Sequence, residues 1–373
     1  MSSSSKKKKN SVLLIHADQH RADCCSVYGN PDVMTPNIES LANDGVVYGN
    51  HFCPYPICTP SRYSLLSGKY VHQHEGWTNH STLRPDIHTL PRELNKLGYK
   101  TSACGKMHFT PTYLDVGFQN MKLCEQLGPG RWDDDYHRYL MSKNKIDLLD
   151  LMDQHPDFRQ HAPEEYWESF GALSSNLDEK DTSTGWIGRQ AVEAIDTWED
   201  DQNFLMVGFV QPHHPFDPPQ EWIDAYSEKK LSILPGWTES FLPRDLSHAK
   251  GHFNYEGLTP EKLRKVMAYY YASISQIDFY VGKMIQALKQ KGLYDQTMII
   301  YTSDHGEYMG FHHMLLKGNH MYDPIMRIPL VIKYPENSNF GTKNNTLSTN
   351  TEIPATIIKS LHLPENPELG NYT

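Results

Sequence analysis

The chain has 373 residues, which is enough for one large α/β domain or two smaller ones. Hydrophobic residues make up 38% of it, so it can bury a sizeable core, and the formal net charge of −10 argues against nucleic acid as a partner. No apolar run is long enough to span a membrane, so we expect no membrane partner.

The amino-terminal residues 1–10 contain four serines followed by four lysines, and we expect a disordered tail there. No apolar stretch typical of a signal peptide precedes the first expected strand, which favours a cytoplasmic protein. If a signal peptide has been removed, a periplasmic or secreted location fits instead. The six cysteines are Cys24, Cys25, Cys53, Cys58, Cys104 and Cys124, and they show no C-x-x-C spacing typical of a metal site.

The first expected element is a buried strand over residues 11–17, an apolar run followed directly by Asp18, Gln19 and His20. Ligands bind at the carboxyl ends of strands in open α/β sheets, so we expect Asp18 at a binding edge. A helix that begins at Thr35-Pro36 and ends near Gly45 follows.

The next expected helix begins in the stretch Cys58-Thr59-Pro60-Ser61-Arg62 and ends at Gly68. Thr59 is predicted to be the N-cap and Pro60 the first helical residue. Cys58 would then lie just outside a helix amino terminus, where free N–H groups favour an anion. On their own, these residues indicate either an activated cysteine or a buried structural cysteine before a capped helix.

Three later strands are also expected to end in polar side chains. Residues 99–104 lead into Gly105-Lys106-Met107-His108, and residues 203–210 lead into a proline-rich loop with His213 and His214. Residues 297–301 lead into Ser303-Asp304-His305. Helices are expected over residues 90–97 and 185–198, and the longest one runs from residue 259 to residue 292. Another strand over residues 328–332 and a helix over residues 351–361 complete the chain.

Residues 113–184 are rich in charged and aromatic side chains without clear periodicity. We interpret this segment as an insertion that caps the site and helps to set specificity, and a solvated surface excursion is the alternative. Its aromatic residues could stack on a sugar ring, whereas the acidic stretch from Trp132 to Tyr136 could receive a cation such as choline.

The stretch from Cys58 to Arg62 has the C-x-P-S-R signature of the sulfatase family, and the chain resembles a sulfatase. Four further motifs follow in the family's order over residues 11–362: G-K-x-H at 105–108, P-H-x-P at 212–215, S-D-H-G at 303–306 with Lys317, and a proline–threonine segment at 354–356. The resemblance implies an alkaline-phosphatase-like three-layer α/β/α sandwich with a largely parallel central sheet. It also implies one catalytic domain over residues 11–373. Because the chain stops at Thr373, we expect the family's smaller carboxyl-terminal subdomain to be absent.

The resemblance also implies the chemistry. A formylglycine-generating enzyme would oxidise Cys58 to formylglycine, whose hydrated aldehyde attacks a sulfate ester. One divalent metal would be bound by Asp18, Gln19, Asp304, His305 and the modified Cys58. Ca²⁺ is the first expectation. Mn²⁺ and Mg²⁺ stay open, because Gln19 stands where many family members have a second carboxylate and His305 offers nitrogen.

The remaining roles implied by the family concern anion binding and proton transfer. Arg62 would hold the hydrated aldehyde, Lys106 and Lys317 would bind sulfate oxygens, His213 would protonate the leaving group and His108 would help to expel sulfate. Asn79 and His214 are expected to contact the substrate.

The substrate expected first is a sulfated saccharide, followed by another small sulfate ester. Two alternatives stay open. One is a phosphodiesterase or phosphonate monoester hydrolase of the same superfamily, which can carry the same metal-binding pairs. The other is a non-catalytic anion-binding protein in which Cys58 stays a thiol.

Overall fold

The computed structural model describes residues 10–126, 133–199, 202–226, 230–250, 252–318, 320–336 and 340–370. Residues 1–9 of the predicted tail lie outside these ranges. Trp132 also lies outside them. No helix in the described part of the chain is both long and apolar enough to cross a bilayer.

The centre of the molecule is an eight-stranded sheet in the order β5-β4-β6-β1-β7-β8-β2-β9. The five strands from β5 to β7 are mutually parallel, whereas β8 runs antiparallel to both of its neighbours. The strands are β1 (Ser11–Ala17), β2 (Val46–Tyr48), β4 (Lys100–Gly105), β5 (Asn120–Leu123), β6 (Asn203–Phe209), β7 (Thr297–Ser303), β8 (Leu330–Lys333) and β9 (Thr342–Asn344). Strands β3 (His51–Phe52) and β10 (Ser348–Thr349) form a separate parallel pair.

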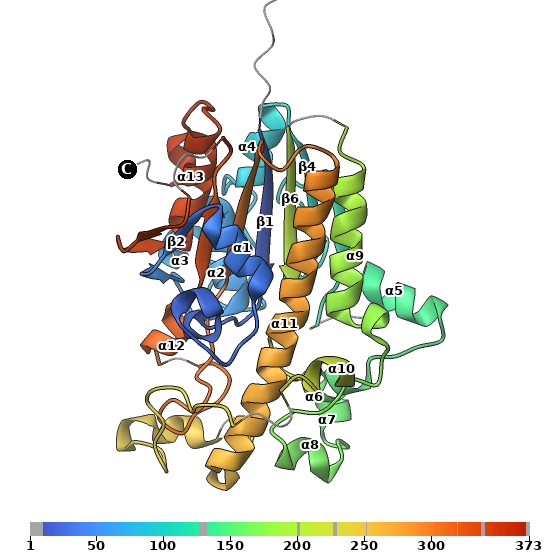
Figure 1. The fold of residues 1–373 in the computed structure, drawn as a ribbon, viewed down its shortest axis with the longest axis vertical. Helices are drawn as coiled ribbons and strands as arrows, with labels where there is room; N and C mark the ends of the chain where they lie inside the picture. The colour runs from blue at the N-terminus through green and yellow to red at the C-terminus, as the bar shows by residue number, and fades with distance from the viewer. Residues whose placement is uncertain are drawn as a thin grey trace, which may run out of the picture.

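Helices cover both faces of this sheet, because successive side chains of a strand point to opposite faces. On β1, Leu13 and Ile15 pack with apolar residues of α1 (Pro36–Asn43), α9 (Ser183–Asp196) and α11 (Pro260–Gln290). Val12 and Leu14 pack instead with residues of α2 (Cys58–Ser67), α4 (Leu90–Lys96) and α13 (Ile353–Ser360). Figure 1 shows α9 and α11 side by side along the sheet. The predicted α/β/α sandwich with a largely parallel sheet is therefore confirmed.

The start of α2 differs from the sequence-based prediction. The helix begins at Cys58, with Ile57 in the N-cap position and Pro60 as the third helical residue. Thr59 does not cap the helix, because its hydroxyl donates a hydrogen bond to the backbone oxygen of His108 at 2.9 Å. The predicted end is confirmed, since Gly68 takes the left-handed conformation, with φ of 67°, that favours glycine after a last turn.

The segment 113–184 contributes both to the sheet and to a lobe beyond it. Its first part contains β5, the edge strand. Its helices are α5 (Asp135–Ser142), α6 (Leu148–Gln154), α7 (Pro156–Arg159) and α8 (Glu164–Glu168). Figure 1 places α6, α7 and α8 next to α10 (Gln220–Ile223), near the end of α11 that lies beyond the sheet. Two further short helices are α3 (Val71–His74) and α12 (Asp323–Met326).

The acidic stretch at the start of α5 serves the fold. Asp134 is buried and caps α5 by accepting a hydrogen bond from the backbone N–H of His137. Tyr136 is buried, packs on Trp186 and donates a hydrogen bond to the backbone oxygen of Asp181 at 2.9 Å. These two side chains therefore do not form the exposed cation receptor that the sequence allowed.

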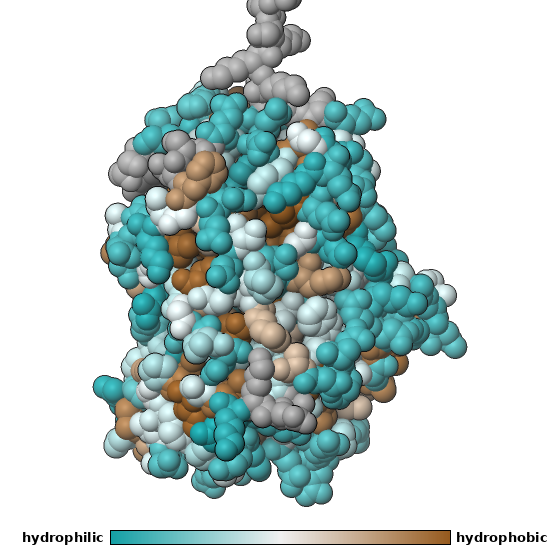
Figure 2. Space-filling model, viewed as in Figure 1, coloured by the Kyte–Doolittle hydropathy of each residue, from teal (hydrophilic) through white to brown (hydrophobic). Residues whose placement is uncertain are grey.

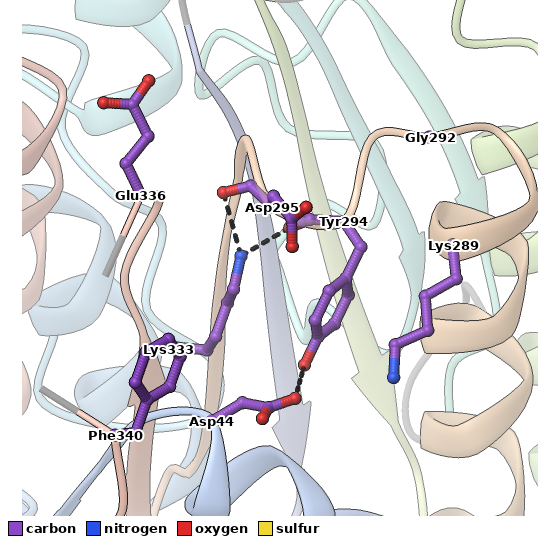
Figure 3. A pocket seen from close by; sticks show the side chains of 8 residues that line it. All are labelled: Asp44, Lys289, Gly292, Tyr294, Asp295, Lys333, Glu336 and Phe340. Carbon is purple, nitrogen blue, oxygen red and sulfur yellow. Dashed lines mark hydrogen bonds between the residues drawn. The ribbon is translucent and has the colours of Figure 1, made fainter. Parts of the chain in front are cut away.

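The surface shown in Figure 2 is mostly hydrophilic, with hydrophobic side chains in separate small patches. A pocket of about 500 Å³ lies at the end of β7 opposite to Asp304 (Figure 3). In it, Lys333 Nζ donates hydrogen bonds to the backbone oxygens of Asp295 at 3.1 Å and Thr297 at 3.2 Å. Tyr294 donates its hydroxyl to Asp44 at 2.6 Å. These hydrogen bonds stabilise the connection between α11 and β7, which lies away from the predicted site.

Candidate active site

The predicted site residues lie together at one edge of the central sheet. Strands β4, β6, β1 and β7 are parallel neighbours, so the residues that follow them, among them Lys106, His213, Asp18 and Asp304, share the carboxyl edge. The amino terminus of α2 faces the same edge and delivers Cys58, which is fully buried. Segments far apart in sequence therefore converge on one buried cluster.

The centre of this cluster is a group of four potential metal ligands. One ligand atom from each of Asp18, Cys58, Asp304 and His305 lies within 4.8 Å of the others. Cys58 Sγ is 3.3 Å from His305 Nε2 and 3.8 Å from Asp18 Oδ1. His305 Nδ1 donates to the backbone oxygen of Gly306 at 2.9 Å, so the ring presents Nε2 to the cluster. Two carboxylates and one imidazole nitrogen suit a divalent cation.

Gln19 borders the cluster through both its backbone and its side chain. Its backbone N–H donates to Asp304 Oδ1 at 3.0 Å. Its side-chain oxygen accepts a hydrogen bond from Lys317 Nζ at 2.9 Å, and its side-chain nitrogen donates to Glu307. The amide is therefore oriented by a cation on one side and a carboxylate on the other.

Arg62 contacts the carboxylates of the cluster. Its guanidinium forms ion pairs with Asp18 Oδ2 at 2.8 Å and with Asp304 Oδ2 at 3.0 Å, and it donates to the backbone oxygen of Lys106. Burial raises the pKa of Asp18, but Lys106, His213 and Arg62 outweigh burial and hold that pKa well below its usual range. Arg62 therefore holds two candidate metal ligands in place and favours their ionised form.

Two lysines flank the cysteine. Lys106 Nζ lies 2.8 Å from Asp18 Oδ2 and donates to Gln126 Oε1 at 2.7 Å. Burial and Asp18 raise the pKa of the Cys58 thiol, but Lys317, His305 and Lys106 outweigh them and the pKa is lowered. The environment of residue 58 therefore favours negative charge, as a site for an oxyanion requires.

The two predicted histidines of the P-H-x-P loop lie beside Lys317. His213 Nε2 is 2.5 Å from Lys317 Nζ, and His213 Nδ1 donates to the backbone oxygen of His214 at 2.6 Å. The side chain of His214 contacts Asp153 Oδ1 at 2.6 Å. The loop therefore places one imidazole in the cluster and a second imidazole behind it.

His108 and Asn79 both contact Thr59, the second residue of α2. The backbone N–H of His108 donates to Glu125 Oε1 at 3.0 Å, and His108 Nδ1 is buried with no hydrogen-bond partner among the described residues. Asn79 accepts a hydrogen bond from the backbone N–H of Thr59 at 3.1 Å. Asn79 thus satisfies a free N–H in the first turn of α2, which Thr59 was expected to do.

Three carboxylates near the site were not singled out from the sequence. Glu307 follows the S-D-H-G motif and accepts hydrogen bonds from Gln19 and from the backbone N–H of Met309 and Leu316. Glu125 and Asp153 come from the segment 113–184, which has no periodicity to indicate them. The position of Glu307 beside a motif was a usable signal, and the other two had none.

Known proteins resemble this chain in sequence and in fold. The sequence model of the Sulfatase family matches residues 10–363. An arylsulfatase of Clostridium perfringens is 28% identical over 369 residues, which cover 92% of this chain and 73% of that protein. An N-acetylglucosamine-6-O-sulfatase of Bacteroides thetaiotaomicron is 24% identical over 381 residues, which cover 94% of this chain and 67% of that protein.

Among solved structures, the phosphonate monoester hydrolase of Agrobacterium radiobacter superposes with a TM-score of 0.77 and 26% identity, covering 95% of this chain and 74% of that chain. The fold and the family match thus span nearly the whole chain, including all the strand ends that form the cluster. The chain therefore belongs to the sulfatase family and is an enzyme of the sulfuric ester hydrolase class.

Proposed function

We propose that the chain hydrolyses a sulfate ester of a carbohydrate, with a formylglycine made from Cys58 as the nucleophile and one divalent metal beside it. The observation that carries this proposal is the convergence of Cys58, two buried carboxylates and His305 within 4.8 Å. A hydrated formylglycine supplies one hydroxyl for attack on sulfur and a second one whose collapse releases sulfate.

The residues of the cluster fit a hard divalent cation. Asp18, Asp304 and His305 would hold it together with residue 58, and the side-chain oxygen of Gln19 would complete the set. The metal, when bound, neutralises charge on the sulfate oxygens. Ca²⁺ remains the first candidate, and the single imidazole keeps Mn²⁺ and Mg²⁺ open.

The side chains around residue 58 divide the remaining work. Lys106 and Lys317 lie on two sides of the cysteine cluster and would bind sulfate oxygens. His213 would give a proton from Nε2 to the leaving oxygen, and the nearby Lys317 ammonium would keep this nitrogen supplied with a proton. His108, whose buried Nδ1 has no partner in the part of the chain that the structure describes, would assist the expulsion of sulfate.

The carbohydrate part of the proposal draws on relatives. The name of the Bacteroides thetaiotaomicron relative gives it N-acetylglucosamine 6-sulfate as substrate, and another relative, from Formosa agariphila, is an ulvan-active sulfatase. Asn79, which contacts the first turn of α2, and His214, which stacks on His213, are the proposed substrate contacts. Maturation would require a formylglycine-generating enzyme as a partner.

A peptide mass over residue 58 tests the proposal. Protein made together with a formylglycine-generating enzyme should show the mass loss expected when a thiol is replaced by an aldehyde. An unmodified thiol in protein that turns over aryl sulfates would refute the formylglycine nucleophile. An unmodified thiol in inactive protein that still binds sulfate would support the non-catalytic alternative.

A phosphonate monoester hydrolase is the second candidate function. It is favoured by the overall superposition on the enzyme of that name from Agrobacterium radiobacter. Matched assays on 4-nitrophenyl sulfate and a 4-nitrophenyl phosphonate monoester distinguish the two. A larger kcat/KM for the sulfate supports the proposal, and a larger kcat/KM for the phosphonate replaces it.

Removal of the metal gives an independent test. EDTA should abolish activity and lower Tm, because a ligand that binds only the folded state stabilises it by about 3 kcal/mol when present at about 100 times its Kd. Elemental analysis of active protein should show Ca, Mn or Mg. Active protein free of all three would exclude the metal site.

A further inference from the structure

The proposed leaving-group histidine is held from behind by a second layer of side chains. The rings of His213 and His214 stack with centroids 4.2 Å apart and an interplanar angle of 25°. His213 Nδ1 donates to the backbone oxygen of His214, which also accepts a hydrogen bond from Gln154 at 3.0 Å. Since a carbonyl oxygen can only accept, the proton of neutral His213 lies on Nδ1 and the lone pair on Nε2 faces Lys317.

Asp153, on α6, contacts the ring of His214. Its Oδ1 lies 2.6 Å from His214 Nδ1, and its Oδ2 accepts the hydroxyl of Tyr166 at 2.6 Å. His252 Nε2 is 3.6 Å from the same Oδ2. Burial raises the pKa of Asp153, but the neighbouring His214 and His252 outweigh burial and hold it below its usual value, so the carboxylate is ionised and accepts these hydrogen bonds.

The burial of this carboxylate is costly. Asp153 is 0% exposed, and within the described ranges its ion-pair partners are histidines rather than lysine or arginine. Burial removes the hydration of a carboxylate, and neutral donors replace it only in part. A neutral side chain would make a purely structural contact at this position with a smaller loss of hydration, so the charge indicates that Asp153 orients a neighbouring group.

We propose that Asp153 is a positioning residue for protonation of the leaving oxygen, acting through His214 on His213. This inference rests on the proposed function, in which His213 is the proton donor. As the bond between sulfur and the leaving oxygen breaks and the bond between sulfur and the nucleophile forms, the electron pair stays on the leaving oxygen. That oxygen takes a proton from His213 Nε2, which receives one from the adjacent Lys317 ammonium, so Lys317 ends as a neutral amine and His213 stays neutral.

The positioning follows from the contacts of the two rings. Asp153 fixes the orientation of the His214 ring, and that ring lies against the face of His213. The backbone oxygen of His214 fixes His213 Nδ1, so Nε2 is the only ring nitrogen of His213 available to the leaving oxygen. Loss of Asp153 removes the ion-pair partner that orients the His214 ring, and so weakens the contact of that ring with the face of His213.

The same three residues, Asp153, His214 and His252, are close enough to hold a metal ion. The hydrogen-bond interpretation is favoured because both oxygens of Asp153 already have a donor at 2.6 Å, one from an imidazole and one from a phenol. A cation would have to displace them. Metal content is nevertheless part of the test.

The experiment is a leaving-group series on the holoenzyme. The values of kcat/KM for 4-nitrophenyl, phenyl and 4-methoxyphenyl sulfate are compared for wild type, Asp153→Asn and His213→Asn. A poor leaving group needs the proton most, so both variants should lose at least about tenfold more rate on phenyl sulfate than on 4-nitrophenyl sulfate. Asp157→Asn, which changes an exposed carboxylate on α7, is the matched control and should leave the series unchanged.

The outcomes separate this inference from the proposed function. If His213→Asn lowers kcat/KM by the same factor for all three substrates, His213 is not the proton donor, and that part of the proposed function fails. If His213→Asn steepens the series and Asp153→Asn does not, Asp153 has no positioning role. If wild type holds a second equivalent of metal that Asp153→Asn lacks, the cluster is a metal site and the inference is overturned.

A second variant covers the case in which Asp153→Asn does not fold. Tyr166→Phe removes one hydrogen-bond donor from Asp153 and leaves the carboxylate in place. It should steepen the leaving-group series in the same direction by a smaller factor. Folded Tyr166→Phe enzyme with a wild-type series would overturn the inference.

Discussion

Cys58 sits at the amino terminus of α2, where every neighbouring cation favours an anion. Cys58→Ala should remove turnover and leave binding of a sulfated ligand nearly unchanged. A methyl group offers no nucleophile, whereas Lys106, Lys317 and His213 stay in place. We expect kcat to fall by more than about 10³, on the order of 4 kcal/mol of lost transition-state stabilisation. Steady-state kinetics and calorimetric binding of a sulfated ligand check the two halves.

Cys58→Ser is the sharper control for the same residue. A serine hydroxyl can attack sulfur, but its sulfate ester has no neighbouring hydroxyl that could collapse and release sulfate. The variant should therefore stop after one turnover and gain the mass of a sulfo group on the peptide that holds residue 58. Repeated turnover at the wild-type rate by Cys58→Ala would place the nucleophile elsewhere.

Gln19 determines how many carboxylates surround the metal. Gln19→Asp adds one and should shift metal preference towards Ca²⁺, which favours carboxylate oxygen ligands. It also loses the amide that donates to Glu307, so the readout is relative activity with Ca²⁺, Mg²⁺ and Mn²⁺ rather than activity itself. Identical profiles in wild type and variant would show that Gln19 is not a ligand.

At the scale of elements, α11 caps α1 across 240 residues of sequence. The carboxylate of Asp278 accepts hydrogen bonds from the backbone N–H of Asn37 at 3.0 Å and of Ile38 at 2.7 Å. Thr35, the N-cap residue of α1, makes no side-chain cap of its own. The long helix therefore satisfies the first turn of its neighbour while it packs on the same face of the sheet.

Asp278→Ala should destabilise the fold by about 2 to 3 kcal/mol, because it removes a cap and leaves buried N–H groups without acceptors. Urea unfolding should show a lower midpoint with an unchanged slope. Glu39→Gln, a change of an exposed side chain on α1, is the control, and its urea midpoint should stay near that of wild type. A change below about 0.5 kcal/mol for Asp278→Ala would mean that water replaces the cap.

At the scale of the whole molecule, a carboxyl group of the site makes the free energy of unfolding depend on pH. Burial raises the pKa of Glu125 to about 7, although the N–H groups of His108 and Met107 oppose the shift. The folded state thus binds more protons than the unfolded state between an ordinary glutamate pKa of 4.5 and about 7. This contribution to stability is complete below that window and is lost as pH rises through it.

Glu125→Gln should remove this slope, which amounts to on the order of 3 kcal/mol across the window. The measurement is the free energy of unfolding on both sides of the window for wild type and variant. Equal slopes in the two proteins would show that Glu125 is ionised throughout.

The sequence by itself determined which segments reach the site. Apolar runs that end in Asp18, Lys106, His213 and Asp304, together with proline and glycine at helix ends, are local signals, and the strands and helices formed close to where these signals placed them. The start of α2 was misplaced by two residues, because the contact of Thr59 with His108 competes with capping and is not visible in sequence. The order of the five motifs along the chain indicated the family.

Only the tertiary structure decided how these residues are held. Arg62 meets Asp304 across 242 residues, and His214 meets Asp153 across 61, so no local pattern could pair them. Asp153 and Glu125 lie in a segment without periodicity, where side chains are selected by a few specific contacts rather than by a repeating apolar face. The physical reason is that strand and helix formation depends on neighbours in sequence, whereas ionisation and orientation in a buried site depend on neighbours in space.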